Sequence, residues 1–319
     1  MRRRAGLLAA LSLAACAPQV PDRLPTAPLP YGAGISITAE PAGPAPGTTM
    51  APGWAFAGGY KLNSAETSRL HGLSDIKVWP DGRLLAVGDQ GDLLEARLTF
   101  DAKGWLAGVA DATLKPVLGE DGQPITSQGD REYDAEGIAE FPDGSRLISL
   151  EQHDRVYFYP KGQTTPRPAP MPGISIVFNK GMEALAAWPA GGADGYLLGV
   201  EGTGEVFRCR VTGACTAYGR VDLEGLELTA LAPLPTGGVA YLLRGYNPLA
   251  GNRIIIKVIG ADGREVDRLQ IARPQVVDNF EGLAAVKRGD GVRFYLLSDD
   301  NFNSTQQTLL FAVDWTPPP

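Results

Sequence analysis

The sequence predicts an all-β fold assembled from repeated small sheets. One unit recurs about five times: a polar residue, a short apolar strand, a turn that contains glycine, a second apolar strand and another polar residue. The copies span residues 71–89, 136–151, 183–201, 229–244 and 281–299. A period of roughly 45 to 65 residues is typical of propellers and other repeat arrays, and no long amphipathic helix interrupts the pattern. We therefore expect a β-propeller with six blades, with five or seven blades as the alternatives.

Further strands complete each expected blade. The second strand follows a turn such as Pro80-Asp81-Gly82 or Pro142-Asp143-Gly144, which suits a tight antiparallel connection. These second strands are expected at residues 84–87, 146–150, 196–200, 239–243 and 294–298. Outer strands are expected at residues 93–99, 155–159, 205–210, 254–259 and 308–313. Residues 54–63 could complete a blade with residues 309–315, and residues 103–130 and 211–228 have room for further strands, which favours six blades.

The N-terminal end of the chain predicts export. Residues 2–4 are arginines, and the apolar stretch that follows, residues 5–13, is too short to span a bilayer. Leu13-Ala14-Ala15-Cys16 resembles the lipobox of bacterial lipoproteins, so we expect residues 1–16 to be a signal peptide that leaves a lipid on Cys16. The alternative is an ordinary secretory signal. Because Ala17, not Asp, follows the cysteine, we expect a lipid-anchored protein on the periplasmic face of the outer membrane.

The remaining chain divides into a tether and one domain. Residues 17–50 are rich in Pro, Ala and Gly, and such a stretch cannot bury enough apolar surface to order itself. A short strand at residues 35–38 is the expected exception. No change in composition divides residues 51–319, so we expect one propeller domain there.

Export makes the other two cysteines interpretable. Cys209 and Cys215 flank a sequence that reads as a strand, a glycine turn and a strand. In an oxidising compartment such a pair forms a disulfide that fixes a hairpin. The alternative is two buried thiols.

Charge limits the class of partner. The chain carries a formal net charge of −7 and no run of Lys or Arg after the signal. Nucleic acid is therefore not an expected partner. An acidic protein is better suited to cations, or to anions that arrive with a bound cation.

Two polar positions recur in every repeat, separated by 15 or 18 residues. The first holds His71, Glu136, Glu183, Thr229 and Glu281, and the second holds Asp89, Glu151, Glu201, Arg244 and Asp299. In a propeller these positions face the axial channel, where several carboxylates repel one another unless a cation intervenes. Oxygen ligands in number suit Ca²⁺, with Mg²⁺ as the alternative. A structural role, in which they bond backbone N–H groups of neighbouring blades, is the other interpretation.

Other catalytic schemes have less support. The sequence has no G-x-S-x-G motif, no P-loop and no dinucleotide-binding glycine pattern. Only His71 and His153 could serve in a Ser-His pair, and Ser74 would not share a strand face with His71. We expect His153 to lie in a loop at a blade rim.

Four motifs resemble the phytase-like β-propeller family, which is described as having esterase-like activity of phytase. They are Asp134-Ala-Glu-Gly-Ile-Ala139, Asn179-Lys-Gly-Met-Glu-Ala-Leu185, Asn279-Phe-Glu-Gly-Leu-Ala284, and Leu297-Ser-Asp-Asp-Asn-Phe-Asn303 with Gln307 and Thr308. The resemblance runs from about residue 58 to the C-terminus. It implies an exported propeller that hydrolyses phosphate or other esters.

The resemblance also implies site residues. Glu136, Glu183 and Glu281 match the glutamates of its Glu-Gly-Ile/Leu-Ala motifs, and Asp299, Asp300 and Asn301 match its Asp-Asp-Asn. The sequence departs from the family where Leu242-Leu243-Arg244 replaces Leu-Glu-Arg, and where His71 and Asp75 replace glycines.

Together these observations predict an extracytoplasmic, metal-dependent ester hydrolase that acts on a small phosphomonoester. We expect Ca²⁺ to bind Glu136, Glu183, Glu281, Asp299 and Asp300. We assign catalytic roles to Glu136, Glu151, Glu201 and Arg244, with Glu151 or Glu201 as the general base. We assign substrate binding to Arg131, His71, Asn179 and Asn279. The alternatives are a non-catalytic propeller with structural calcium, and a lactonase-like enzyme with one calcium on Glu136, Asn179, Asn279 and Glu281.

Overall fold

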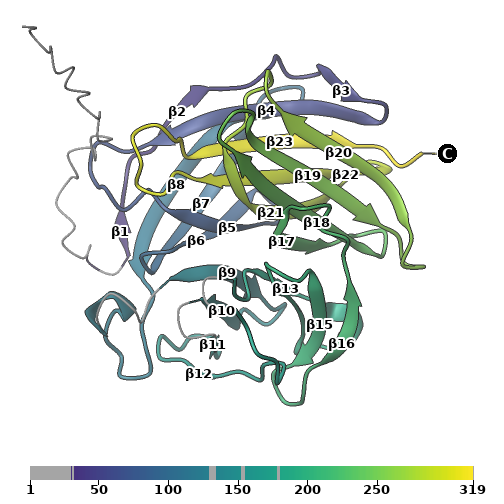
Figure 1. Cartoon of the computed structure of the whole chain (residues 1–319). Coiled ribbons are helices and arrows are strands. Elements are labelled where there is room, and N and C mark those ends of the chain that lie inside the picture. The colour runs from purple at the N-terminus through teal and green to yellow at the C-terminus, as the bar shows by residue number, and fades with distance from the viewer. Residues whose placement is uncertain (1–29, 31, 129–133, 152–154, 178–179, 319) are drawn as a thin grey trace, which may run out of the picture.

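The computed structural model describes residues 30, 32–128, 134–151, 155–177 and 180–318. In these residues the chain forms five antiparallel sheets around a common axis, and two short 3-10 helices, Ile125–Gln128 and Pro189–Gly191 (Figure 1). The innermost strands contact one another in turn, and the last of them contacts the first, which closes the ring. They are β5 (Leu73–Val78), β9 (Ala135–Glu140), β13 (Ala184–Ala187), β17 (Glu227–Pro233) and β21 (Asn279–Arg288).

Each blade extends outward from its inner strand. Blade one continues with β6 (Arg83–Gly88), β7 (Asp92–Phe100), β8 (Leu106–Pro116) and β1 (Ala33–Gly34). Blade two continues with β10 (Arg146–Leu150), β11 (Arg155–Tyr159) and β12 (Arg167–Pro168). Blade three continues with β14 (Gly195–Gly199), β15 (Glu205–Arg210) and β16 (Thr216–Arg220), and blade four with β18 (Val239–Asn247), β19 (Gly251–Ile259) and β20 (Glu265–Ala272).

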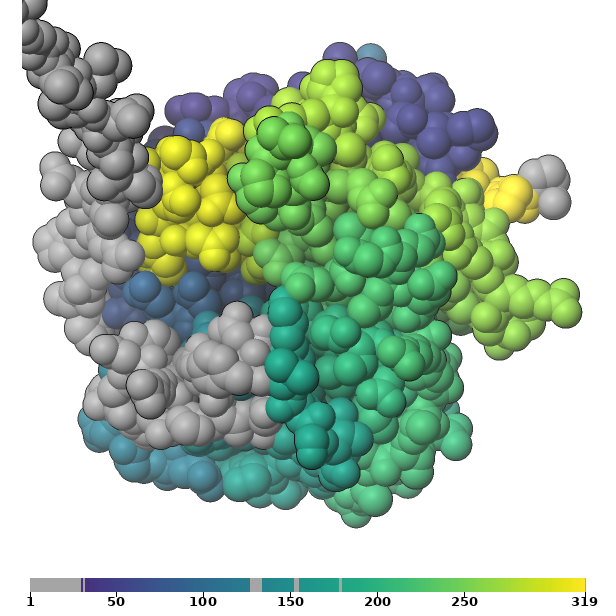
Figure 2. Space-filling model, viewed as in Figure 1, coloured from purple at the N-terminus to yellow at the C-terminus, as the bar shows by residue number. Residues whose placement is uncertain are grey.

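Blade five joins the two ends of the fold. Strands β22 (Gly291–Asp299) and β23 (Leu309–Trp315) follow β21, and β4 (Trp54–Asn63) pairs with β23 from Lys61 opposite Leu309 to Trp54 opposite Trp315. This is the pairing that the sequence predicts for residues 54–63 and 309–315. Figure 2 shows the yellow C-terminal segment beside the purple N-terminal strands on the surface.

The expectation of six blades is wrong, because the described residues form five. The segments that suggested a sixth blade extend existing ones instead. Strand β8, within residues 103–130, pairs with β7, and β16, within residues 211–228, pairs with β15. Both are outer strands, so they lengthen a blade without adding an inner strand to the ring.

The folded region begins before residue 51. Strand β1 pairs with β8, and β2 (Thr38–Pro41) and β3 (Thr49–Ala51) pair with β4. Ile35, Ile37 and Ala39 alternate along this segment and pack against the core. That period of two buries one face of an otherwise polar segment. Residues 33–51 therefore belong to the propeller, and the expected strand at 35–38 lies slightly later, at β2.

In the part of the chain that the structure describes, the apolar core consists of five clusters, one between each pair of neighbouring blades. A middle strand is therefore buried on both faces. This accounts for near-continuous apolar runs such as Leu84 to Val87 and Tyr196 to Leu198, all of which are almost fully buried. The Pro-Asp-Gly turns have their glycines, Gly82 and Gly144, at φ of 82° and 87°, a conformation that other residues rarely adopt.

Cys209 at the end of β15 and Cys215 before β16 form a disulfide, with their Cα atoms 4.0 Å apart. It closes the hairpin of β15 and β16, the two outer strands of blade three, away from the inner strand β13. Among the described residues, no helix has the length and apolar character needed to cross a membrane.

Candidate active site

The polar positions of the repeats gather at one end of the propeller axis. The first position lies at the start of an inner strand, and the second lies at the end of the next strand, which runs antiparallel to it. In blades four and five, the second-position residues Arg244 and Asp299 pair with Glu227 and Asn279, each of which lies two residues before the first position. Because the five inner strands surround one axis, residues from distant repeats approach one another there.

Five carboxylates from blades two and three lie close together at this end of the axis. Glu151, Glu183 and Glu201 are buried, and one oxygen of each lies within 4.8 Å of those of the other two. Asp134 and Glu136 form a second group of the same dimensions with Glu151, which both groups share. We call these five residues the axial carboxylates.

The axial carboxylates repel one another. Burial, followed by the charges of Glu183 and Asp134, raises the pKa of Glu136 well above its ordinary value. Burial and Glu201 raise the pKa of Glu183 in the same way. Burial, followed by Glu227, raises the pKa of Glu201 to about 7. A positive charge between these groups would stabilise their ionised forms.

Arg244 brings one such charge from blade four. Its Nη1 lies 2.9 Å from Glu281 Oε1 and donates to Asn279 Oδ1, and its Nη2 lies 3.4 Å from Glu201 Oε1. Burial alone would lower the pKa of Arg244, but Glu281, Glu183 and Glu201 raise it above its ordinary value. Its Nε is buried and has no hydrogen-bond partner in the part of the chain that the structure describes.

Sequence reasoning missed three residues of the site. Lys180 places its Nζ 3.2 Å from Glu201 Oε2 and also contacts Glu227. Asp134 belongs to the second carboxylate group. Lys180 and Asp134 belong to the motifs that contain Glu183 and Glu136. Their closeness in sequence to these glutamates could have identified them as site residues. Glu227 pairs with Arg244 across strands β17 and β18, but it does not lie at a recurring polar position of the repeats.

Glu281 and Asp299 lie beside the axial carboxylates and belong to neither group. Glu281 Oε1 accepts a hydrogen bond of 2.8 Å from Asn279 Nδ2 and contacts Arg244. Asn279 is thereby held by two neighbours, which leaves its side chain little freedom to bind substrate. Asp299 accepts a hydrogen bond from Asn301 N at 2.7 Å, and burial, then Glu281 and Asp89, raise its pKa well above the ordinary value.

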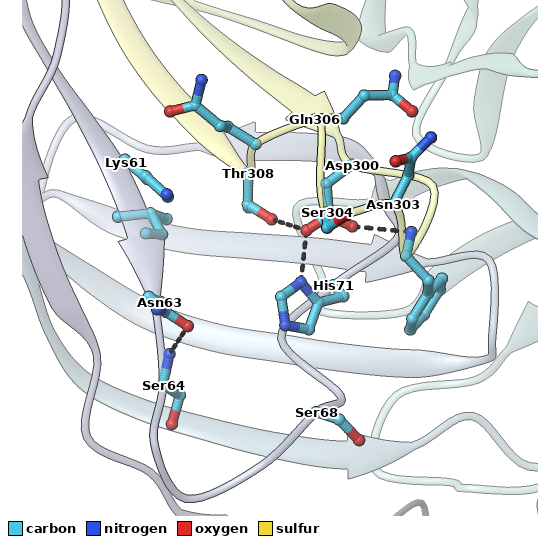
Figure 3. Close-up of a pocket in the computed structure, with 13 residues that line it drawn as sticks. Lys61, Asn63, Ser64, Ser68, His71, Asp300, Asn303, Ser304, Gln306 and Thr308 are labelled. Atoms are coloured by element: carbon cyan, nitrogen blue, oxygen red, sulfur yellow. Dashed lines mark hydrogen bonds and ion pairs between the residues drawn. The ribbon is translucent and has the colours of Figure 1, made fainter. Parts of the chain in front are cut away.

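Asp300 points away from the axial carboxylates. Its Oδ2 accepts hydrogen bonds from His71 Nδ1 and, at 2.9 Å, from Thr308 Oγ1. Its Oδ1 accepts bonds of 3.1 Å from the backbone N–H groups of Gly72 and Phe302. These four donors occupy both oxygens, so the structure does not bring Asp300 to the other residues that we expected to bind calcium. His71 and Asp300 both line a neighbouring pocket (Figure 3).

Blade one contributes one carboxylate to this end of the axis. Burial and then Asp134 raise the pKa of Asp89 to about 8, and its Oδ1 is buried with no hydrogen-bond partner among the described residues. Thr229, at the first recurring position in blade four, is buried and donates to Leu242 O at 3.4 Å. Asp75 has a structural role instead, because its Oδ2 accepts a 2.9 Å bond from Ile138 N of the next blade.

Three of the expected site residues lie outside the described residues: Arg131, Asn179 and Cys16. His153 does too. Their assignments stay predictions.

The geometry defines a class of protein: a five-bladed propeller whose blades converge on a buried cluster of carboxylates with an arginine beside it. The sequence profile of the Phytase-like family, described as "Esterase-like activity of phytase", matches residues 68–302. The chain belongs to this family, as its motifs predict. No curated protein matches the sequence.

Solved structures resemble the chain only remotely. Regucalcin from Agrobacterium tumefaciens, described as a calcium-binding protein, is 14% identical over 91% of this chain and 98% of its own, with a TM-score of 0.48. Virginiamycin B lyase from Staphylococcus aureus is 9% identical over 84% and 78%, with a TM-score of 0.42. Hydrazine synthase from Kuenenia stuttgartiensis is 13% identical over 76% of this chain, with a TM-score of 0.39, and the match spans only 62% of that protein's chain.

Proposed function

We propose that this protein hydrolyses phosphomonoesters at the axial carboxylates, with the help of a divalent cation. The observation that carries the proposal is the buried group of Glu151, Glu183 and Glu201, whose oxygens lie within 4.8 Å of one another. Membership of a family described by esterase-like activity supports the reaction class. The raised pKa values of the group support a cation, because one would offset the repulsion that raises them.

The dimensions of the group fit calcium. Oxygen ligands lie about 2.3 to 2.6 Å from Ca²⁺, so two ligands on opposite sides of the ion are about 5 Å apart. The corresponding separation for Mg²⁺ is about 4 Å. Oxygens within 4.8 Å of one another are compatible with either ion, and we propose calcium because it accepts more carboxylate ligands. We propose that Glu151 and Glu183 of this group hold it together with Glu136, a member of the second group whose charge interacts with that of Glu183.

The cation, when bound, supplies positive charge that offsets the charge of a phosphate group and polarises it. Arg244 adds a second positive charge in a fixed position, because Glu281 and Asn279 hold its Nη1. Its Nε has no partner among the described residues, so it keeps a hydrogen that an anionic oxygen of the substrate could accept. A guanidinium held in this way stabilises charge that develops in the transition state without reorganising.

Glu201 is the proposed general base. Its pKa is raised to about 7, so a fraction of the carboxylate is ready to accept a proton near neutral pH. Lys180 Nζ at 3.2 Å and Arg244 Nη2 at 3.4 Å fix its two oxygens. The proton of the attacking water passes to Glu201, the oxygen of that water bonds to phosphorus, and the bond to the alcohol oxygen breaks. The released oxygen takes a proton from solvent, and Glu201 returns its proton to solvent.

We further propose that the protein is exported and anchored to the cell envelope through a lipid on Cys16. A Cys16→Ser variant should lose incorporation of labelled palmitate and leave the membrane fraction. Retention of the label would contradict the proposal.

The purified protein should be assayed with a phosphomonoester, a carboxylic ester and a panel of lactones, with calcium and with excess chelator. We expect phosphomonoester turnover that chelator abolishes and calcium restores. Glu183→Gln should remove it, whereas the same change at the exposed Glu120 should leave it intact. Calcium that raises the melting temperature without turnover of any ester would contradict the proposal and favour the binding propeller.

A further inference from the structure

A pocket of about 390 Å³ lies beside the axial end, between the end of β4 and the loop that joins β22 to β23. Its lining is mostly uncharged and polar, with amides and hydroxyls from Asn63, Ser64, Ser68, Asn303, Ser304 and Gln306. Lys61 and His71 also line it, from the two sides that Figure 3 shows. The volume lies at the lower end of the range that binds small molecules.

The His71 ring has a fixed orientation on the wall of this pocket. Its Nδ1 bonds Asp300 Oδ2, and the ring of Phe302 lies 6.0 Å from its centre. An ionised carboxylate can only accept, so in the neutral imidazole Nδ1 carries the hydrogen and Nε2 keeps a lone pair. Figure 3 shows this second nitrogen on the edge of the ring opposite Asp300, turned toward the side where Asn63 and Ser64 lie.

Asp300 is itself held in place. It is 5% exposed and accepts four hydrogen bonds, from His71, Thr308 Oγ1 and two backbone N–H groups. Burial would raise its pKa, but the bonds from His71, Gly72 and Thr308 lower it overall. A buried carboxylate that orients an imidazole, whose other nitrogen faces a cavity, is the arrangement that makes histidine a general base.

The backbone beside Asp300 is strained in a way that supports this geometry. Asn301 and Phe302 both have positive φ, 49° and 51°, and such values are costly for a bulky residue. Asp299 and Asp300 hold them there through their bonds to Asn301 N and Phe302 N. Gly72 has φ of 60° and lies so close that a Cβ there would collide with Phe302 and Asp89. These features fix His71 and Asp300 relative to each other.

We propose that His71 and Asp300 form a second reaction centre, which hydrolyses small uncharged carboxylic esters in this pocket without a metal ion. His71 is the catalytic residue and Asp300 is a positioning residue. The proposal is independent of the axial cation site, because among the described residues the only ionisable side chains that line the pocket are Lys61, His71 and Asp300.

The reaction balances with water as the only co-reactant. His71 Nε2 takes a proton from water as the water oxygen bonds to the carbonyl carbon of the ester. Lys61 Nζ, across the pocket, supplies positive charge for the oxygen that becomes negative. The bond from carbon to the alkoxy oxygen then breaks, and the leaving oxygen takes the proton from Nε2. The products are a carboxylic acid and an alcohol.

An uncharged substrate follows from the surroundings. The bonds that Asp300 accepts lower its pKa and keep it ionised, and its negative charge opposes the entry of a phosphate or carboxylate that no cation accompanies. Amide and hydroxyl groups in number match the carbonyl and ether oxygens of a neutral ester.

The test is hydrolysis of p-nitrophenyl acetate and butyrate by the purified protein in excess chelator. We expect turnover that falls on the order of 10²-fold or more in His71→Gln, the size typical of a lost general base. The matched control is His153→Gln, at the other histidine of the chain, which should keep full turnover. Absence of turnover in the chelated wild-type protein, or full turnover in a folded His71→Gln variant, would overturn the proposal.

A second measurement keeps the proposal falsifiable if His71→Gln does not fold. With only two histidines in the chain, ¹⁵N NMR of the imidazoles should resolve His71 directly. We expect a neutral ring protonated at Nδ1, and we expect Asp300→Asn to change that tautomer and to lower turnover. A wild-type ring protonated at Nε2 would overturn the proposal. Because all of these experiments omit the cation, their failure is distinguishable from failure of the phosphomonoesterase proposal.

Discussion

Arg244 of blade four lies against Glu281 of blade five, with Nη1 2.9 Å from Oε1. The guanidinium also reaches Glu201 of blade three, so that one side chain connects three blades at the axial end. With Lys180, which lies 3.2 Å from Glu201, it supplies positive charge to the carboxylates that are buried there. Removal of the Arg244 side chain leaves less positive charge to offset the negative charge of those carboxylates.

Arg244→Met should destabilise the cation-free protein by about 3 kcal/mol, because breaking a buried ion pair leaves an uncompensated charge. Urea unfolding in chelator measures the change. Arg97→Met is the matched control: Arg97 is half-exposed and lies 4.0 Å from Asp81, so its loss should cost less than about 1 kcal/mol. Equal effects of the two substitutions would contradict the role given to Arg244.

The stability of the cation-free protein should fall as the pH rises from about 5 to about 8. The pKa of Glu201 is raised from 4.5 to about 7 and that of Asp89 from 3.8 to about 8. Between its unfolded and folded pKa, such a carboxyl group binds a proton more often in the folded chain, so its stabilising effect is lost as the pH increases through the folded value.

Melting temperatures in chelator across this pH range check that prediction, and calcium should restore stability most at the upper end. Glu183→Gln should flatten the profile, because it removes one of the repelling charges. A melting temperature that rises with pH in chelator would show that the axial carboxylates ionise without penalty.

Asp75→Ala should destabilise the protein by about 2 to 3 kcal/mol while the folded fraction keeps its activity. The carboxylate of Asp75 accepts bonds from Ile138 N at 2.9 Å and Lys77 Nζ at 2.6 Å, and a hydrogen bond to a charged group is worth about 1.5 to 3 kcal/mol. Asp290→Ala, at an exposed turn, is the control and should be neutral. A loss of specific activity in Asp75→Ala would move this residue from the scaffold to the site.

The sequence predicts the inner part of each blade better than the outer part. Inner and second strands are buried on both faces, so their apolar runs and polar ends repeat clearly. The outer strand β16 is exposed at every residue, so nothing in its composition distinguishes a further strand of blade three from the start of another blade. The blade count was wrong for this reason, whereas the closure of the ring by β4 and β23 was predicted.

The candidate site was predictable only in part, because it depends on distances between blades. Glu136 and Glu183 come together as the repeats suggest. Glu281 instead contacts Arg244 of the neighbouring blade and Asn279, and the contact between blades cannot be read from the sequence of one repeat. Asp299 and Asp300 are neighbours in sequence, and yet they face different surroundings, because successive side chains on an extended strand point to opposite sides. Their roles therefore separate only in three dimensions.

Calcium binding tests the central claim most directly. Isothermal titration of calcium into chelator-treated protein should give saturable binding that Glu183→Gln weakens strongly and that Glu120→Gln leaves unchanged. Phosphomonoester turnover in the same samples should follow the occupancy of the site. Equal calcium affinity in the wild-type protein and Glu183→Gln, or turnover that does not depend on occupancy, would contradict the account.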